Sequence, residues 1–145
     1  AEIARQQGCN VDSIDYTDLM DPDLRVERLL AELEKEVDDF ILVGSSMGGY
    51  VALVASEVVT AKAVFLMAPA LYMPGFKKQQ HDTKSPHIEI VHAWSDGVIP
   101  AENSIKYAQQ ADCTLHLVIG DHALNVVIEK VENLFDQFLT SALTT

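Results

Sequence analysis

A serine stands between glycines in a short run that follows directly on a stretch of apolar residues. The run Gly44–Gly49 reads GSSMGG and fits the pattern G-x-S-x-G with Ser46 at its centre. The pattern is typical of a nucleophile on a sharp turn between a strand and a helix, where a Cβ atom on the neighbouring residues would clash. Such a turn also points the first N–H groups of the next helix at whatever the serine attacks. The run therefore predicts a nucleophile and part of an anion site. Ser45 is the competing hydroxyl, but only Ser46 has a glycine two residues before it and two residues after it.

A serine needs a general base within hydrogen-bond reach, and the base needs an acid that holds it in the right tautomer. Two later segments supply these residue types. Asp96, in the sequence SDG, follows an apolar run that ends at Trp94, and His122, in the sequence GDH, follows one that ends at Ile119. Because the carboxyl ends of parallel strands lie at one edge of an open sheet, we expect Ser46, Asp96 and His122 to meet there.

Each of these residues also has a simpler interpretation, and the hypothesis depends on all three occurring together. An aspartate in SDG is often only a turn residue, and a histidine before a helix is often only exposed. Asp121 is a rival acid, but its position next to His122 gives awkward geometry for orienting that ring. The remaining four histidines fit less well, since two lie inside predicted strands and two flank an irregular segment: His92, His116, His81 and His87.

The elements that must position these residues alternate short apolar runs with helical patterns, which is typical of a parallel-sheet α/β architecture. The sequence predicts strands at 11–16, 40–43, 63–67, 88–94 and 114–119, and helices at about 23–37, 47–58, 101–110 and 124–139. Asp21 before Pro22 is a start signal for the first of these helices. We predict one α/β domain over residues 1–145, with an open, mainly parallel sheet and helices on both faces.

Residues 69–86 contain prolines, a glycine and lysines without a clear period. Irregular segments of this length are often lids or binding loops, so this one is either a plain surface loop or a vestigial lid that shapes a pocket. Within it, Tyr72 and Met73 are our candidate substrate-binding residues.

Composition excludes several classes of partner. The net charge of −12 argues against nucleic acid, whose affinity comes mostly from neutralised phosphates, and equally against anionic membrane surfaces. There is no apolar run of the roughly 18 residues that a membrane span needs. The first residues are not a basic stretch followed by an apolar one, so we expect no secretion signal. Cys9 and Cys113 show no metal or redox spacing, and the chain has no H-E-x-x-H motif. We expect a cytoplasmic protein with a small-molecule substrate and with neither a metal nor a cofactor.

Three segments together resemble the α/β-hydrolase superfamily, and the resemblance covers essentially the whole chain. They are residues 41–49, residues 92–100, where an aspartate precedes a hydrophobic-proline pair, and residues 120–122. Within that superfamily the chain is similar to small, nearly lidless bacterial hydrolases. The resemblance implies that Ser46 is the nucleophile, Asp96 the orienting acid and His122 the base. It also implies that the backbone N–H of Met47 is one donor of the oxyanion hole.

One feature of the family has no counterpart in this sequence. The second oxyanion donor of the family comes from a His-Gly-type loop after an early strand, which a helix follows. Residues 1–7 resemble the end of that helix, so we expect the early strand and its loop to precede Ala1.

The residues and the resemblance together predict a serine hydrolase that cleaves a small carboxylic ester or a related acyl compound through an acyl-enzyme. A thioesterase or a small-amide hydrolase would use the same residues. A different class, a non-catalytic interaction module on the same scaffold, is the alternative, because a fold does not fix a function.

Overall fold

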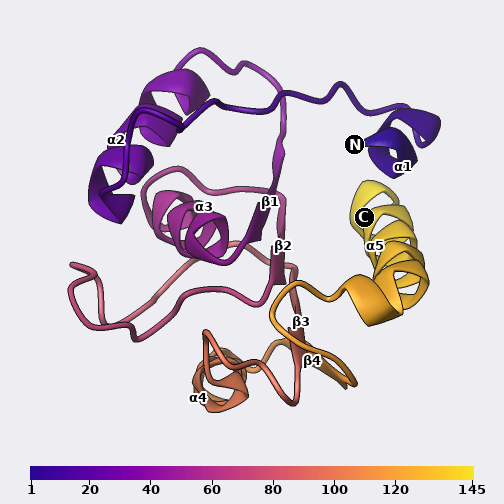
Figure 1. The fold of residues 1–145 in the computed structure, drawn as a ribbon. Coiled ribbons are helices and arrows are strands. Elements are labelled where there is room, and N and C mark those ends of the chain that lie inside the picture. Colours follow the sequence, from indigo (N-terminus) through magenta and orange to yellow (C-terminus); the bar gives the residue numbers. More distant parts are fainter.

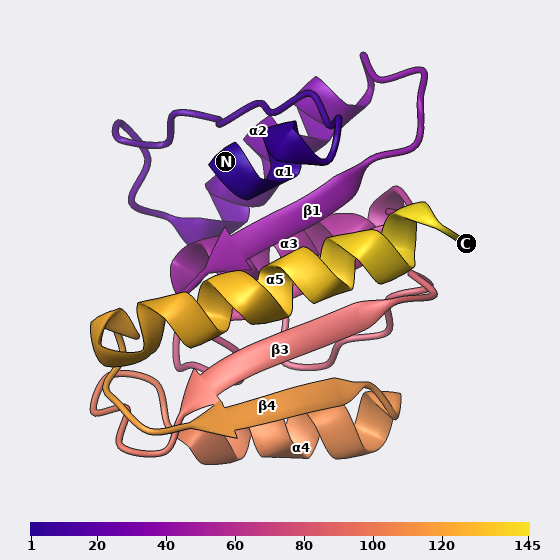
Figure 2. The ribbon, with the colours of Figure 1, turned by 90° about the vertical axis from the view of Figure 1, so that its right-hand side faces the viewer.

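An open parallel sheet of four strands forms the centre of the computed structural model, which describes residues 1–145. The strands are β1 (Ile41–Ser45), β2 (Ala63–Met67), β3 (Ile88–Ala93) and β4 (Thr114–Val118), and they lie side by side in this order. All three pairings are parallel. The carboxyl ends therefore share one edge, where Figure 2 shows the arrowheads of β1, β3 and β4.

Helices cover both faces of the sheet, as the sequence predicts. They are α1 (Glu2–Gln6), α2 (Pro22–Leu33), α3 (Met47–Val58), α4 (Ala101–Ala111), the short 3-10 helix η1 (Asn125–Val127) and α5 (Ile128–Leu143). In Figure 1, α2, α3 and α4 lie on one side of the strands, and α1 and α5 lie on the other. No helix combines the length with the apolar character that crossing a membrane requires.

Strand β2 is apolar at all of its positions. Val64 and Leu66 belong to the core cluster under α2 and α3, whereas Phe65 belongs to the cluster on the α5 side. There the Phe65 ring meets the Phe138 ring of α5 at a centroid distance of 5.1 Å. Because successive side chains point to opposite faces and both faces of β2 are covered, apolar side chains are favoured at every position of this strand.

The start of α2 follows from local chemistry. The Asp21 carboxylate accepts hydrogen bonds from the backbone N–H groups of Asp23 and Leu24, and Pro22 occupies the first helical position. This cap confirms the predicted start signal. The helix ends at Leu33 rather than at residue 37. The next three residues, 34–36, are all charged and add nothing to the apolar face that the helix buries.

The predicted strand at 11–16 is wrong. These residues form no strand, and none of their backbone groups is paired with β1. A groove of about 1790 Å³ lies beside them and is lined by residues of this segment, of β1 and of α5. A β-strand is defined by its hydrogen-bonded neighbour, so an alternating sequence without such a neighbour stays extended but unpaired.

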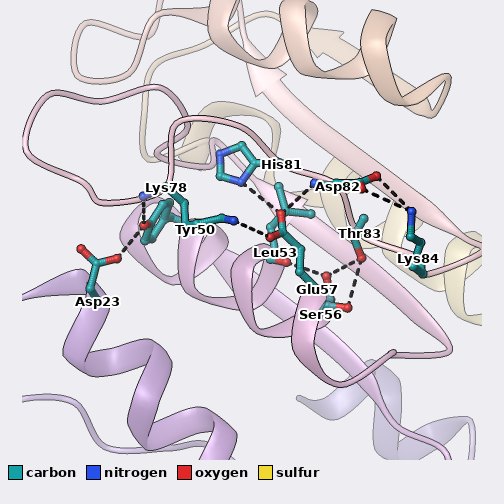
Figure 3. A network of polar contacts seen from close by, with 10 residues as sticks. All are labelled: Asp23, Tyr50, Leu53, Ser56, Glu57, Lys78, His81, Asp82, Thr83 and Lys84. Carbon is teal, nitrogen blue, oxygen red and sulfur yellow. Dashed lines mark hydrogen bonds and ion pairs between the residues drawn. The ribbon is translucent and has the colours of Figure 1, made fainter.

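The connection from β2 to β3 contains residues 69–86 and has no helix or strand, as its composition predicts. Figure 3 shows how polar contacts fasten it to α2 and α3. The buried Tyr50 hydroxyl donates to the Asp23 carboxylate at 2.6 Å and accepts from the Lys78 backbone N–H at 2.9 Å. The Glu57 carboxylate accepts from the Asp82 backbone N–H at 2.8 Å. The segment is thus held at several points along its length.

Candidate active site

Ser46 occupies the sharp turn between β1 and α3 that the sequence predicts. Its φ of 54° and ψ of −121° lie in a backbone region that a residue with a side chain rarely adopts. Hydrogen bonds to neighbouring backbone hold it there. The Ser46 N–H donates to the Met67 carbonyl at 2.9 Å, and the Ser46 carbonyl accepts from Ala70 N–H at 2.9 Å and from Gly49 N–H at 3.0 Å.

Two glycines around Ser46 are required by close contacts, and they differ in part from those of the G-x-S-x-G pattern. A Cβ atom on Gly44 would overlap the Gly48 carbonyl oxygen and would lie 2.8 Å from the Gly49 nitrogen. A Cβ atom on Gly49 would lie 2.8 Å from the Pro69 Cβ. Gly48, the second glycine of the pattern, has nothing within 4 Å of such an atom. Close packing of the turn therefore depends on Gly44 and Gly49.

The structure brings Ser46, His122 and Asp96 together in one chain of contacts. His122 Nε2 lies 2.9 Å from Ser46 Oγ, and His122 Nδ1 lies 2.7 Å from Asp96 Oδ2. An ionised carboxylate can only accept a hydrogen bond. The His122 ring therefore carries its proton on Nδ1, and this N–H donates a hydrogen bond to Asp96. This tautomer leaves Nε2 free to accept the hydroxyl proton of Ser46, which is the arrangement that activates a serine.

Asp96 is held as an anion by a set of donors around its fully buried carboxylate. Oδ1 accepts from the backbone N–H groups of Val98 and Ile99, each at 2.8 Å. Burial by itself raises the pKa of Asp96, but the hydrogen bonds from His122 and from these two amides outweigh it. The pKa of Asp96 therefore lies below its ordinary value of 3.8. An ionised carboxylate at this position stabilises a positive charge on His122.

The Met47 amide, which the family resemblance implies as an oxyanion donor, is the first N–H of α3. No backbone or side-chain acceptor takes its hydrogen bond. The first N–H groups of a helix lack intrahelical partners, and the helix dipole adds positive potential there. Because it is the first N–H of α3, the Met47 amide is available to donate to an anion beside Ser46.

Tyr72 and Met73 make no hydrogen bond to Ser46, Asp96 or His122, and their described contacts are with other residues. The Tyr72 ring lies 5.7 Å from the His81 ring and beneath Lys106, whose Nζ is 4.0 Å from the ring centre. Met73 Sδ lies 3.7 Å from the Asn103 side-chain nitrogen. Both belong to the segment whose first residues contact Ser46, and their part in substrate binding stays a prediction.

The rival residues lie apart from this chain of contacts. Ser45 is the last residue of β1 and is exposed, and its hydroxyl has no hydrogen-bond partner. The side chain of Asp121 makes no hydrogen bond, although its carbonyl accepts from Leu124 N–H at 3.1 Å. No group of three or more His, Cys, Asp or Glu side chains is arranged to hold a metal ion.

Sequence reasoning missed a contact of Asp96. His92 in β3 is fully buried, and its Nε2 lies 3.0 Å from Asp96 Oδ2. In the sequence, His92 fits less well as a candidate base because it falls inside a predicted strand. The spacing of four residues between His92 and Asp96 was the available signal, but its meaning depends on how the loop after β3 turns back.

Similar solved structures identify the family. One is a protein of Xanthomonas campestris pv. campestris whose description assigns it to the alpha/beta superfamily of hydrolases. It is 35% identical, the match covers 97% of this chain and 86% of that one, and the TM-score is 0.83. The chain belongs to the α/β-hydrolase superfamily.

More distant α/β hydrolases share the fold. Alpha/beta hydrolase domain-containing protein 10 from mouse is 16% identical, with a TM-score of 0.74 over 97% of this chain and 81% of that one. A serine hydrolase involved in carbazole degradation, the CarC enzyme, is 19% identical, with a TM-score of 0.65 over 90% of this chain and 74% of that one. No protein-family model and no curated protein sequence matches the chain.

In this α/β hydrolase, the three central side chains come from three separate connections at the carboxyl edge of the sheet. Ser46 follows β1, Asp96 follows β3 and His122 follows β4. Strand β2 lies between β1 and β3, and its Met67 carbonyl accepts the hydrogen bond that holds Ser46 in place. The parallel order of the strands is thus what makes side chains far apart in the sequence neighbours in space.

Proposed function

We propose that this α/β hydrolase is a serine hydrolase that cleaves a small carboxylic ester or a related acyl compound through an acyl-enzyme. The observation that carries the proposal is the unbroken contact chain from Ser46 Oγ to His122 Nε2 at 2.9 Å and from His122 Nδ1 to Asp96 Oδ2 at 2.7 Å. A nucleophile, a base and an orienting acid in this order have no evident use in a structural element alone.

In the first half-reaction, Ser46 Oγ attacks the acyl carbon while His122 Nε2 takes the hydroxyl proton. Asp96 stays ionised and stabilises the resulting imidazolium. The Met47 N–H donates to the oxyanion of the tetrahedral intermediate. When the bond between the acyl carbon and the leaving oxygen breaks, His122 gives its proton to that oxygen and the alcohol leaves.

In the second half-reaction, His122 takes a proton from water, and the hydroxide attacks the acyl carbon. Breaking the bond to Ser46 Oγ releases the acid, and the proton on His122 returns to the serine. Protons balance over the two halves, so the ester and one water give one acid and one alcohol. Besides water, the mechanism uses Ser46, His122 and Asp96, whose mutual contacts support it, together with the Met47 amide.

A fluorophosphonate probe tests the proposal directly, because it reacts with activated serines and not with ordinary ones. We expect the wild-type protein to be labelled and the Ser46→Ala variant to be unlabelled. Ser45→Ala is the matched control, since its hydroxyl is adjacent in sequence but makes no contact with His122, and this variant should still be labelled. An unlabelled wild-type protein that is folded by circular dichroism would instead support the non-catalytic interaction module.

The acyl class needs a second measurement. A panel of p-nitrophenyl esters of increasing chain length, assayed beside acyl thioesters, would rank the substrates by kcat/KM. We expect short-chain esters to be preferred. A preference for thioesters would assign the protein as a thioesterase with the same three residues, and turnover that survives in Ser46→Ala would reject the mechanism.

A further inference from the structure

His92 extends the contact chain beyond Asp96. We propose that His92 is a positioning residue that holds Asp96 in the orientation His122 requires, through the Ile99 carbonyl and through its own Nε2–H. The inference rests on the proposed function, because a positioned acid matters to activity only if Ser46 and His122 are catalytic.

The side chain of His92 links three elements beneath the site. It projects from β3 and is fully buried. Its Nδ1 lies 2.7 Å from Ser104 Oγ on α4, and its Nε2 lies 2.9 Å from the Ile99 carbonyl oxygen in the loop that carries Asp96. Oδ2 of Asp96, the oxygen that accepts from His122, is 3.0 Å from the same Nε2.

The neighbours of the ring determine where its proton lies. A carbonyl oxygen and a carboxylate oxygen surround Nε2, and both can only accept. Nε2 therefore carries a proton, and this N–H donates a hydrogen bond to the Ile99 carbonyl. The hydroxyl of Ser104 can donate to Nδ1, so a neutral ring with its proton on Nε2 satisfies every polar atom in this buried place.

This tautomer acts on both oxygens of Asp96. The Ile99 carbonyl is fixed by His92, and the Ile99 N–H is one of the two donors to Oδ1. The positive end of the Nε2–H dipole lies beside Oδ2 and favours its negative charge. His92 thus restrains the loop and polarises the acid, while the acid orients His122.

A histidine that only filled space would have different consequences. An apolar residue of similar volume would then preserve activity, whereas a polar residue with the wrong shape would not. If His92 is a positioning residue, the apolar replacement should lose activity and a polar replacement that can donate a hydrogen bond should keep it. Glutamine can place its amide nitrogen near the position of Nε2 and donate to the Ile99 carbonyl, but leucine cannot donate at all.

The test compares His92→Leu, His92→Gln and Ser104→Ala in the full chain. For His92→Leu we expect kcat on a p-nitrophenyl ester to fall roughly 10- to 100-fold with little change in KM, since small misplacements of a catalytic group act on the chemical step. His92→Gln should recover most of that loss. Ser104→Ala removes only the hydroxyl that contacts His92 Nδ1, on the side of the ring away from Asp96. It should therefore lower kcat less than His92→Leu does. His116→Gln is the matched control, because His116 lies on β4 and its ring contacts Glu89 instead.

A proton NMR measurement keeps the inference separate from the proposed function. The His122 Nδ1 proton shared with Asp96 should give a far-downfield resonance in wild-type protein without any substrate. We expect this resonance to move upfield or to vanish in His92→Leu and to persist in His92→Gln and His116→Gln. If Ser46 is never labelled, the proposed function fails, yet the NMR comparison still tests the positioning of Asp96.

Two outcomes would overturn the inference. One is a folded His92→Leu variant with wild-type kcat and an unmoved resonance. The other is a His92→Gln variant that loses as much as His92→Leu. If His92→Leu does not fold, Ser104→Ala serves in its place, and an unchanged resonance and kcat in that variant would also count against the role.

Discussion

Alanine substitutions at three glycines around Ser46 should have three different effects on stability. At Gly44, the new Cβ would overlap the Gly48 carbonyl oxygen, which is backbone and cannot rotate away. Overpacking of this kind typically costs about 1–3 kcal/mol, and we expect Gly44→Ala at the upper end. For a chain of this length each kcal/mol lowers Tm by roughly 2–4 °C, so the expected loss is about 6–12 °C.

Gly49→Ala should be milder, and Gly48→Ala should be harmless. The Cβ at residue 49 would lie 2.8 Å from the Pro69 Cβ and 2.9 Å from its Cα, a less severe overlap than at Gly44, although the segment that carries Pro69 must still shift. We expect a cost of about 1–2 kcal/mol. At Gly48 the new atom would meet nothing within 4 Å. Gly48 is helical, so alanine there should be neutral or stabilising by up to about 0.5–1 kcal/mol.

Thermal and urea unfolding of the three variants measure the change in stability. Fluorophosphonate labelling of each folded protein measures the reactivity of Ser46. We expect labelling to be lost in Gly44→Ala and retained in Gly48→Ala. The reasoning is refuted if Gly48→Ala lowers the free energy of unfolding as much as Gly44→Ala does, because the space beside Gly48 would then not be open.

Three further predictions concern the parts that support the site. Asp21→Ala removes the cap of α2 and should lower the free energy of unfolding by about 1 kcal/mol, measured by urea unfolding with Asp21→Asn as the control that retains a cap. Tyr50→Phe deletes the hydroxyl that donates to Asp23, so Tm should fall, and an unchanged Tm would show that water replaces the bond. Burial raises the pKa of Glu57, but the contacts with His81 and nearby groups outweigh it, so the pKa lies below the ordinary 4.5. A carboxylate whose pKa is lowered on folding stabilises the folded protein at pH values above its unfolded pKa. This stabilisation is lost as the pH falls through the folded pKa. Wild-type protein should therefore lose more stability than Glu57→Gln between about pH 6 and pH 3 in urea titrations, and equal losses would contradict this.

The fold and the meeting of Ser46, Asp96 and His122 could be predicted because each rests on a local pattern. Strand β2 and helix α3 have the predicted bounds, and the other three strands and α4 differ by one or two residues at their ends. Ser46, Asp96 and His122 each stand just after a strand, and the topology of a parallel sheet brings such positions together. No long-range information was needed beyond the alternation of strands and helices.

The remaining features depend on neighbours that the sequence does not name. Residues 11–16 alternate like a strand but have no hydrogen-bonded partner, so the pattern alone misleads. The direction of the Tyr72 side chain depends on its φ of 57°, which no propensity predicts for a tyrosine. The contact of His92 with Asp96 arises because the loop after β3 folds back over its own strand. Each of these is set by tertiary structure.

The strained turn at Ser46 is stabilised by its surroundings more than by its own glycines. A residue in such a backbone region costs about 1–3 kcal/mol, and one buried hydrogen bond contributes about 0.5–1.5 kcal/mol. Bonds to the Met67 carbonyl and from the Ala70 N–H tie Ser46 to β2 and to the first residues after it. Two or three such bonds are enough to offset the strain. The first residues of the irregular segment, Pro69 included, therefore belong to the nucleophile turn, because they lie against Gly49 and bond to Ser46.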